Sequence, residues 1–427
     1  MTDLASPAGG FWDAEPAPLP QGRIAALDIV RGVAVMGILA MNIVAFAMPF
    51  QAYMNPTAFG LESPADLGSW LFSFIFIDGK MRGLFSFLFG ASTLLVIERA
   101  QAAGESPAKV HYARMFWLLI FGLLHFYLVW FGDILASYAM TGLLLFFFRN
   151  LPVRALVIWG IALLIAQCAL MAGGAWEVNQ LAAVMEAGRP DPAAVESYRG
   201  FQEAFGTIRG RELAQNMALH LGPWTGLVHE RLVEHGFEPF ASLMFFLSET
   251  LAYMLFGMAG LKSGFLTGDW APARYRKWAL LCFGLAIPAY ATIAWLLIRA
   301  DFSVPMVFTM VLLATTPVRP LMIIAIAAAI ILLTRRSGWL VDRIAAAGRA
   351  AFTNYLGTSI VMTTLFYGYG LGLYGQLSRI ELWLPVIAAW VVMLAWSKPW
   401  LDRFRYGPFE WLWRSLARGR LEPMRKA

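Results

Sequence analysis

The sequence predicts an all-α, polytopic integral membrane protein, and three observations support this fold class. Hydrophobic residues make up 59% of the 427 residues and charged residues only 14%, against roughly 25% charged residues in an ordinary soluble domain. Charge-free apolar runs recur along the chain, several of them near the ~20 residues that a membrane-spanning helix needs. Lysine and arginine gather in alternate connections between these runs, which is the positive-inside pattern.

From these runs we expect about ten transmembrane helices, with both termini in the cytoplasm. The predicted helices cover residues 24–48, 66–98, 113–131, 133–149, 153–173, 239–262, 276–298, 319–335, 350–372 and 381–398. The apolar run 302–318 is a further candidate. Counting it as a span would move Arg335 and Arg336 to the outer face, so we interpret it as a re-entrant or interfacial segment.

The second predicted helix is expected to be broken. Residues 66–98 would form a straight helix of about 50 Å, which exceeds the ~30 Å hydrocarbon thickness of a bilayer. Its middle holds two glycines and three charged residues, in the order Asp78-Gly79-Lys80-Met81-Arg82-Gly83. Broken helices are tolerated at membrane depth where they line a cavity, so we expect Asp78, Lys80 and Arg82 to bind substrate.

One polar insertion, residues 174–238, divides the chain into two halves. By the span count it lies outside the membrane, and we expect short amphipathic helices that cover the outer face. Residues 23–173 then form an N-terminal five-helix bundle and residues 239–400 a C-terminal one. Residues 1–22 are predicted to be a disordered cytoplasmic tail, and residues 401–427 a basic, aromatic interfacial helix and tail.

Several function classes are not supported by the composition. Basic residues lie at the ends of apolar runs and form no stripe, which argues against nucleic acid as a partner. Cys168 and Cys282 lie inside apolar runs and indicate no disulfide framework. The histidines show no metal-ligand spacing, and there is no Walker loop, dinucleotide fingerprint or nucleophile elbow. We expect no metal and no tightly bound cofactor.

The first helix carries polar residues that need an explanation, because charges inside a span cost several kcal/mol unless they are paired or hydrated. Asp28 and Arg31 are three residues apart and share one helical face. They form either a salt bridge that anchors the helix or a site where Arg31 binds an anionic group such as a phosphate. Asn42 lies three turns further along the same face, as a candidate hydrogen-bonding residue.

The next polar residues lie around the predicted hairpin of the third and fourth helices. A lone histidine such as His125 is most often a packing residue, but Asp133 opens the following helix and is a candidate partner. A carboxylate fixes the imidazole tautomer and raises its basicity, which suits a general base. Glu249 is the lone carboxylate of the sixth helix, and it is either a structural acid or a coupling site.

Several motifs resemble the YeiB family of bacterial membrane proteins. They include Arg23-Ile-Ala-Ala-Leu27-Asp28-Ile-Val-Arg31-Gly32, the segment Asp78 to Gly90, Gly122-Leu-Leu-His125, Gly132-Asp133 with Tyr138, and Phe404-Arg405-Tyr406-Gly407-Pro408. The stretch from about 239 looks like that family's C-terminal domain of unknown function. The N-terminal half is also distantly similar to transmembrane acyltransferases, including the acyltransferase-3 proteins and heparan-α-glucosaminide N-acetyltransferase. Acyltransferase-3 proteins carry an arginine in the first span and a histidine eleven residues later, where this chain has Arg31 and Asn42.

The resemblance implies a membrane-embedded acyltransferase that moves an acyl group from cytoplasmic acyl-coenzyme A to an envelope or small-molecule acceptor. We assign the donor to Arg31, Asp28 and Arg349, and the chemistry to His125, Asp133 and Asn42. The remaining candidates would bind the acceptor: Asp78, Lys80, Arg82, Tyr138, Glu249, Asn354 and Tyr355. The expected location is the bacterial cytoplasmic (inner) membrane, with lipid and a small molecule as partners; a homodimer is compatible with the sequence. The alternatives are a secondary transporter that uses Asp28, Asp133 and Glu249, and a non-catalytic membrane scaffold.

Overall fold

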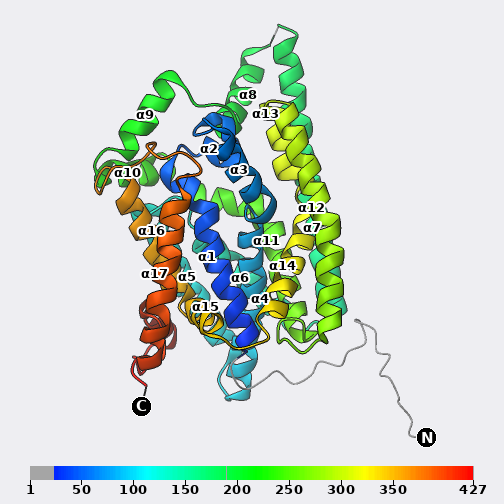
Figure 1. Ribbon diagram of the computed structural model, residues 1–427, viewed down its shortest axis with the longest axis vertical. Coiled ribbons are helices and arrows are strands. Elements are labelled where there is room, and N and C mark those ends of the chain that lie inside the picture. The colour runs from blue at the N-terminus through cyan, green and yellow to red at the C-terminus, as the bar shows by residue number, and fades with distance from the viewer. Residues whose placement is uncertain (1–23, 189, 427) are drawn as a thin grey trace, which may run out of the picture.

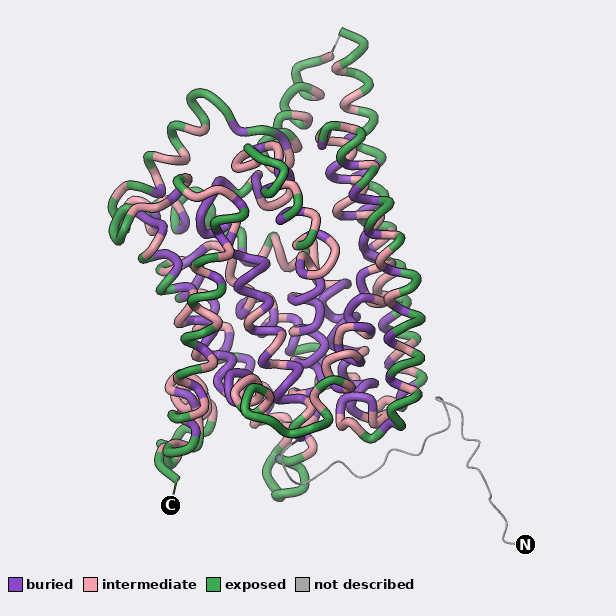
Figure 2. The backbone as a smooth tube through the Cα atoms, viewed as in Figure 1, coloured by how far each residue is buried: buried purple, intermediate pink, exposed green. Residues whose placement is uncertain are grey.

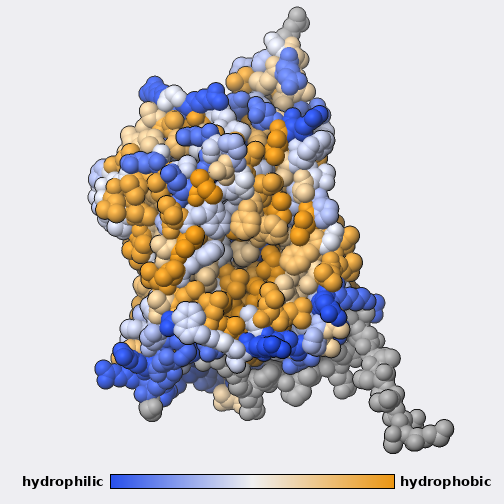
Figure 3. Space-filling view, viewed as in Figure 1, coloured by the Kyte–Doolittle hydropathy of each residue, from blue (hydrophilic) through white to orange (hydrophobic). Residues whose placement is uncertain are grey.

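The computed structural model describes residues 24–188 and 190–426, and the regular secondary structure in these ranges is helical (Figure 1). The expected all-α class is therefore confirmed. The predicted disordered tail, residues 1–22, lies outside the described residues. An apolar belt runs around the visible face of the molecule between two polar ends (Figure 3), as a membrane protein requires.

Six helical runs are long and apolar enough to cross a membrane. They are α1 (Ala25–Ala47), Pro64–Ala102 with α3 (Pro64–Phe76) and α4 (Lys80–Ala102), α7 (Val153–Glu186), α11 (Glu238–Lys262), α12 (Pro272–Arg299) and α17 (Trp383–Arg403). A bent run, α13 (Val304–Val307) with η2 (Phe308–Ala314) and α14 (Arg319–Leu333), makes a seventh if it is one span. The chain is thus a multi-pass membrane protein with six to seven candidate spans.

If the bent run is one span, three of the ten expected spans do not reach the length and composition of a candidate span. The helix α5 (Pro107–Leu128) carries Lys109, His111 and Arg114 in its N-terminal turns, which lowers its apolar character. The helices α6 (Leu135–Phe148) and α16 (Ala351–Phe366) have only 14 and 16 residues. After α16 the apolar sequence continues into a turn, so the length of the apolar run overestimated the length of that helix. The helix α6 is bounded by Asp133 and Arg149, which limit its length.

The predicted break in the second helix is present at residues 77–79, between α3 and α4. Gly79 has a φ of +72°, in the left-handed region that glycine adopts without strain. The run 302–318 is helical and leads into α14 with a bend of 54°. It is therefore joined to the eighth predicted helix and does not form a separate span.

The helix α1 is buried along most of its length (Figure 2), and α15 (Trp339–Arg349) crosses it closely. A Cβ atom at Gly32 would lie 2.0 Å from the carbonyl oxygen of Ile344, and one at Gly348 would lie 1.9 Å from that of Asp28. Only glycine permits this approach. The crossing brings Arg349 beside the start of α1, where Asp28 and Arg31 lie.

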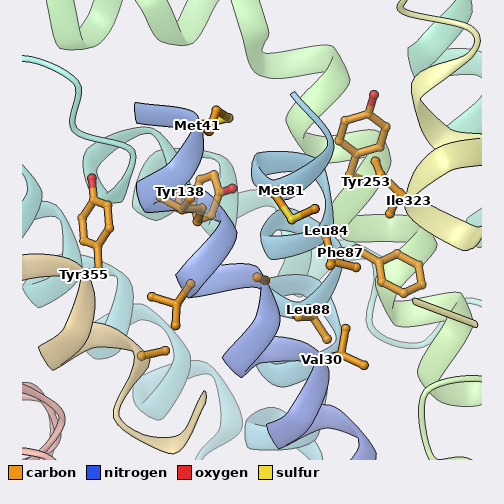
Figure 4. Close-up of a cluster of buried hydrophobic side chains, with 14 of the residues drawn as sticks. Val30, Met41, Met81, Leu84, Phe87, Leu88, Tyr138, Tyr253, Ile323 and Tyr355 are labelled. Carbon is orange, nitrogen blue, oxygen red and sulfur yellow. The ribbon is translucent and has the colours of Figure 1, made fainter. Parts of the chain in front are cut away.

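A second close crossing joins α4 and α11. A Cβ atom at Gly257 would lie 1.7 Å from the carbonyl oxygen of Phe87, and one at Gly90 would lie 2.0 Å from that of Met254. Figure 4 shows Phe87 in the same apolar cluster as Tyr253 of α11. The crossing sets the separation of the two helices, and thereby places Arg82 of α4 opposite Glu249 of α11.

Three short helices follow α7 and cover one end of the molecule (Figure 1): α8 (Pro192–Phe205), α9 (Gly210–His220) and α10 (Trp224–Val233). They are fastened to the bundle by polar contacts. The Nδ2 atom of Asn55 donates to the carbonyl oxygen of Phe205 at 3.0 Å, and the indole N–H of Trp224 donates to that of Leu128 at 2.8 Å. The ring of His220 stacks on Tyr374, with 4.3 Å between centroids.

The stacked His220 predicts a pH dependence of stability. Burial, with a smaller contribution from the Arg231 charge, lowers the pKa of His220 to about 4, although the hydrogen bond to the Asn216 carbonyl raises it. The unfolded chain binds a proton near the ordinary pKa of about 6.5, so the free energy of unfolding falls as the pH decreases from there towards 4.

We expect the melting temperature of His220→Phe to fall less than that of the wild type between about pH 7 and pH 5, because phenylalanine keeps a flat ring and cannot titrate. Differential scanning fluorimetry in detergent measures both. The exposed His229 on α10 provides the control, since His229→Phe should behave as the wild type does. Parallel melting curves for His220→Phe and the wild type would refute this role of His220.

Candidate functional site

A cavity with a volume of about 500 Å³ lies at the end of the molecule where α1 begins. We call it the basic cavity, because arginines from five parts of the chain line it. They are Arg31, Arg99, Arg114, Arg349, Arg405 and Arg414. The carboxylates that line the same cavity are Asp28 and Glu410, so positive charge is in excess.

Both carboxylates of the basic cavity already have partners. Asp28 accepts a hydrogen bond from the Arg31 guanidinium at 3.2 Å, and Arg31 also donates to Ser92 Oγ at 2.6 Å. Glu410, on α18 (Pro408–Arg418), accepts from the backbone N–H groups of Phe352 at 2.6 Å and Thr353 at 3.0 Å, at the start of α16. Burial raises the pKa of Glu410, and these hydrogen bonds oppose the rise. The cavity lining thus contains six arginines and two carboxylates.

The second cavity has a volume of about 330 Å³ and lies nearer the end covered by α8 to α10. We call it the ion-pair cavity, because Glu249 accepts hydrogen bonds there from both Arg82 and Arg319. Glu249 also accepts from the hydroxyl of Tyr253 at 2.8 Å, and Arg319 donates to Thr315 Oγ1 at 2.6 Å. Three helices, α4, α11 and α14, therefore meet at one buried carboxylate.

The broken second helix contributes to the same cavity. Asp78, Gly79, Lys80 and Arg82 all line it. Lys80 is buried, donates to the carbonyl oxygen of Phe74, and lies 3.5 Å from the ring centroid of Tyr290. Buried ammonium groups need such contacts in place of water.

The two cavities share a wall. Tyr138 lines both of them, and its hydroxyl bonds with Ser86 Oγ at 2.7 Å and with the carbonyl oxygen of Arg82 at 3.0 Å. Tyr355 lines the basic cavity and Trp130 the ion-pair cavity. The ring of His125 packs against both Tyr355 and Trp130, with centroid distances of 5.2 Å and 6.5 Å.

His125 and Asp133 form a hydrogen-bonded pair in this wall. Nδ1 of His125 lies 2.8 Å from Oδ1 of Asp133, and Oδ2 of Asp133 accepts the N–H of Ala136 at 2.8 Å. The carboxylate is thus held by the first turn of α6, and it fixes the orientation of the imidazole. Nε2 of His125 is buried and has no hydrogen-bond partner among the described residues. His125 itself lines neither cavity.

The structure separates the residues that the sequence grouped as acceptor-binding. Asp78, Lys80, Arg82, Tyr138 and Glu249 line the ion-pair cavity, together with Asn42. Tyr355 lies on the side of the basic cavity instead.

Asn354 lies apart from both cavities and ties helices together. Its amide donates to the carbonyl oxygen of Ala347 at 3.0 Å and accepts from the indole of Trp396 at 2.9 Å. A polar residue at the start of a helix is as useful for such packing as for binding.

Sequence reasoning missed Arg319, Arg405 and Arg414. Arg319 opens the predicted helix 319–335 but receives no role from the sequence, and the other two belong to the tail that is expected to lie on the bilayer surface. A single arginine between two apolar runs was the available signal for Arg319, since such a charge within a membrane needs a partner. Among the described residues no group of three or more His, Cys, Asp or Glu side chains could hold a metal ion.

Comparison with known proteins identifies relatives over nearly the full chain. The chain is 32% identical to the uncharacterized protein YxaH of Bacillus subtilis (strain 168), over 96% of this chain and 97% of that protein. It is also 32% identical to the uncharacterized protein YeiB of Escherichia coli (strain K12), over 92% of this chain and 96% of that protein. The model of a family described as a protein of unknown function (DUF418) matches residues 261–420. No solved structure matches the chain.

Proposed function

The chain belongs to the DUF418 family of YeiB and YxaH, and we propose that it is a membrane-embedded acyltransferase. One observation carries the proposal. A basic cavity and an ion-pair cavity share a wall, and this wall holds the oriented His125–Asp133 pair. Nε2 of His125 has no hydrogen-bond partner in the part of the chain that the structure describes. Such an arrangement suits two substrates that approach from opposite sides and react at a general base.

In this proposal the protein lies in the bacterial cytoplasmic membrane, with ten spans and both termini in the cytoplasm. The helices α5, α6 and α16 are then spans whose ends are covered by neighbouring helices, which permits a shorter apolar length. The basic cavity faces the cytoplasm, because the lysine- and arginine-rich connections lie on that side.

The donor is acyl-coenzyme A, which carries several phosphate charges at one end and a thioester at the other. Arginine forms paired, charge-assisted hydrogen bonds with phosphate oxygens, so the basic cavity suits the phosphate end. Arg31 is well placed for this role, because Asp28 and Ser92 hold its guanidinium at the cavity.

The chemistry follows from the His–Asp pair. Nε2 of His125 takes the proton of an acceptor hydroxyl or amine, whose oxygen or nitrogen attacks the thioester carbon. The carbon–sulfur bond breaks, and the coenzyme A thiolate leaves and recovers the proton from the imidazolium. Asp133 keeps Nδ1 protonated, which leaves Nε2 as the basic nitrogen. Since His125 lines neither cavity, the wall must open at Tyr355 or Trp130 for the substrates to reach it.

Acetyl-coenzyme A binding tests the donor site. We expect saturable binding to purified wild type in detergent by calorimetry, and binding at least tenfold weaker, about 1.4 kcal/mol, in Arg31→Ala. Arg276 is exposed on α12 and does not line the cavity, so Arg276→Ala is the matched control and should bind as the wild type does. A well-folded wild type that binds no acetyl-coenzyme A would exclude the donor assignment.

A secondary transporter is the second candidate, and one specific observation favours it. Two interrupted helical runs, α3 with α4 and η2 with α14, meet at the Arg82–Glu249–Arg319 cluster. Broken helices with charged residues often form transport sites. Exchange of a labelled solute across proteoliposomes without coenzyme A would favour this candidate over acyl transfer.

A further inference from the structure

We infer that the ion-pair cavity binds a small hydroxyl-bearing organic anion, through a carboxylate or phosphate held by Arg319 and Arg82. The inference rests on the proposed function, because it names the class of acceptor that the acyltransferase would use. It is independent of where the donor binds.

The first argument is charge. Two guanidiniums, those of Arg82 and Arg319, share the single carboxylate of Glu249, so the described residues provide only one ion-paired carboxylate for two adjacent positive charges. A buried unbalanced charge is costly in a membrane protein, and an anionic ligand removes that cost.

The other carboxylates that line the cavity are not ion-paired with either guanidinium among the described residues. Asp133 is hydrogen-bonded to His125, and Glu238 lies near the outer end with His235 at 3.3 Å. Lys80 and Asp78, at the helix break, bring one charge of each sign to the cavity.

The second argument is a set of polar atoms that are buried without a hydrogen-bond partner among the described residues. Each belongs to a side chain that lines this cavity: Nε of Arg319, Nε1 of Trp130 and Oε1 of Gln167. Arg319 is only 9% exposed, so bulk water does not satisfy it. Buried polar groups are normally hydrogen-bonded, and this set of donors with one acceptor matches a ligand that carries both an anionic group and hydroxyls.

The third argument is the size and lining of the cavity. A Cβ atom at Gly79 would lie 2.7 Å from Nε of Arg319, so a side chain at the helix break would collide with the guanidinium. The cavity volume of about 330 Å³ is near the lower end of the usual range for ligand sites, roughly 300–1,000 Å³. The indole of Trp130 supplies an aromatic wall. A molecule of about the size of a monosaccharide fits these limits.

Calorimetric binding of three soluble probes, without any acyl donor, tests the inference. The probes are glucuronate, glucose 6-phosphate and uncharged glucose, which share a hydroxylated ring and differ in charge. We expect one or both anions to bind wild type, glucose to bind at least tenfold more weakly, and Arg319→Gln to lose at least tenfold in affinity for the anion. If Arg319→Gln does not fold, the same measurement is made on Arg82→Gln, which keeps the Arg319–Glu249 pair.

Two further arms complete the test. Phosphatidylglycerol and phosphatidylcholine, each added to the detergent, show whether a lipid headgroup presents the anion. Binding of phosphatidylglycerol but not of phosphatidylcholine, if it depends on Arg319, would support the same chemistry from a lipid source. The inference would be overturned if glucose bound as tightly as the anions, or if none of the anionic probes bound. It would also be overturned if the arginine variants bound the anion as tightly as the wild type does. Acetyl-coenzyme A binding, measured separately, reports on the proposed function and is unaffected by these outcomes.

Discussion

Replacing Glu249 by alanine is expected to destabilise the protein by roughly 3–5 kcal/mol. Glu249 is buried and is the carboxylate shared by Arg82 and Arg319, so its removal leaves two guanidiniums together without a counter-ion. Truncating one member of a buried charge cluster lowers the free energy of unfolding by far more than the whole cluster contributes to it, because the remaining charges stay desolvated. The melting temperature and the fraction of monodisperse protein in detergent measure the loss.

Two further variants make this prediction specific. Glu234 is exposed at the end of α10, and Glu234→Ala should leave the melting temperature unchanged. The triple variant Glu249→Leu, Arg82→Met and Arg319→Met removes all three charges and should recover much of the stability, since apolar replacement of a buried ion cluster is often neutral or stabilising. A Glu249→Ala protein as stable as the wild type would contradict the geometry of the cluster.

Replacing His125 by glutamine is expected to lower acyl transfer by roughly 10²–10⁴-fold, the usual contribution of general acid–base catalysis. Glutamine retains a polar group that can hydrogen-bond Asp133 but cannot take a proton at neutral pH. Coenzyme A release from acetyl-coenzyme A, followed with a thiol reagent, measures the rate.

The same variant should bind acetyl-coenzyme A as the wild type does, because His125 does not line the basic cavity. Asp133→Asn should also lose rate, because it favours the opposite imidazole tautomer. A His125→Gln rate equal to that of the wild type would exclude His125 as the base.

Features set by neighbouring residues could be predicted from the sequence. The Asp28–Arg31 pair follows from their spacing on one helix, and the approach of Asp133 to His125 follows from a hairpin that turns between them. The break at Gly79 follows from glycines and charges inside an apolar run. Each depends on a few consecutive residues whose physical preferences agree.

Features set by distant parts of the chain could not be predicted. The basic cavity joins Arg31 to Arg405 and Arg414, and this depends on the close α1–α15 crossing and on Glu410 holding the start of α16. No pattern in a single sequence states which helices cross. For the same reason the pairing of Arg319 with Glu249 could not be predicted. The length of α16 was overestimated because apolar residues continue beyond it into a turn.

The central claim is that an acyl group passes from one cavity to the other across the shared wall. Inverted membrane vesicles from cells that express the protein test it when acetyl-coenzyme A, labelled in the acetyl group, is supplied outside. The proposal predicts that label enters a product in the vesicle lumen or lumenal leaflet with the wild type, and does not with Arg31→Ala or His125→Gln. Equal labelling by the wild type and both variants, or label that stays entirely in coenzyme A, would contradict it.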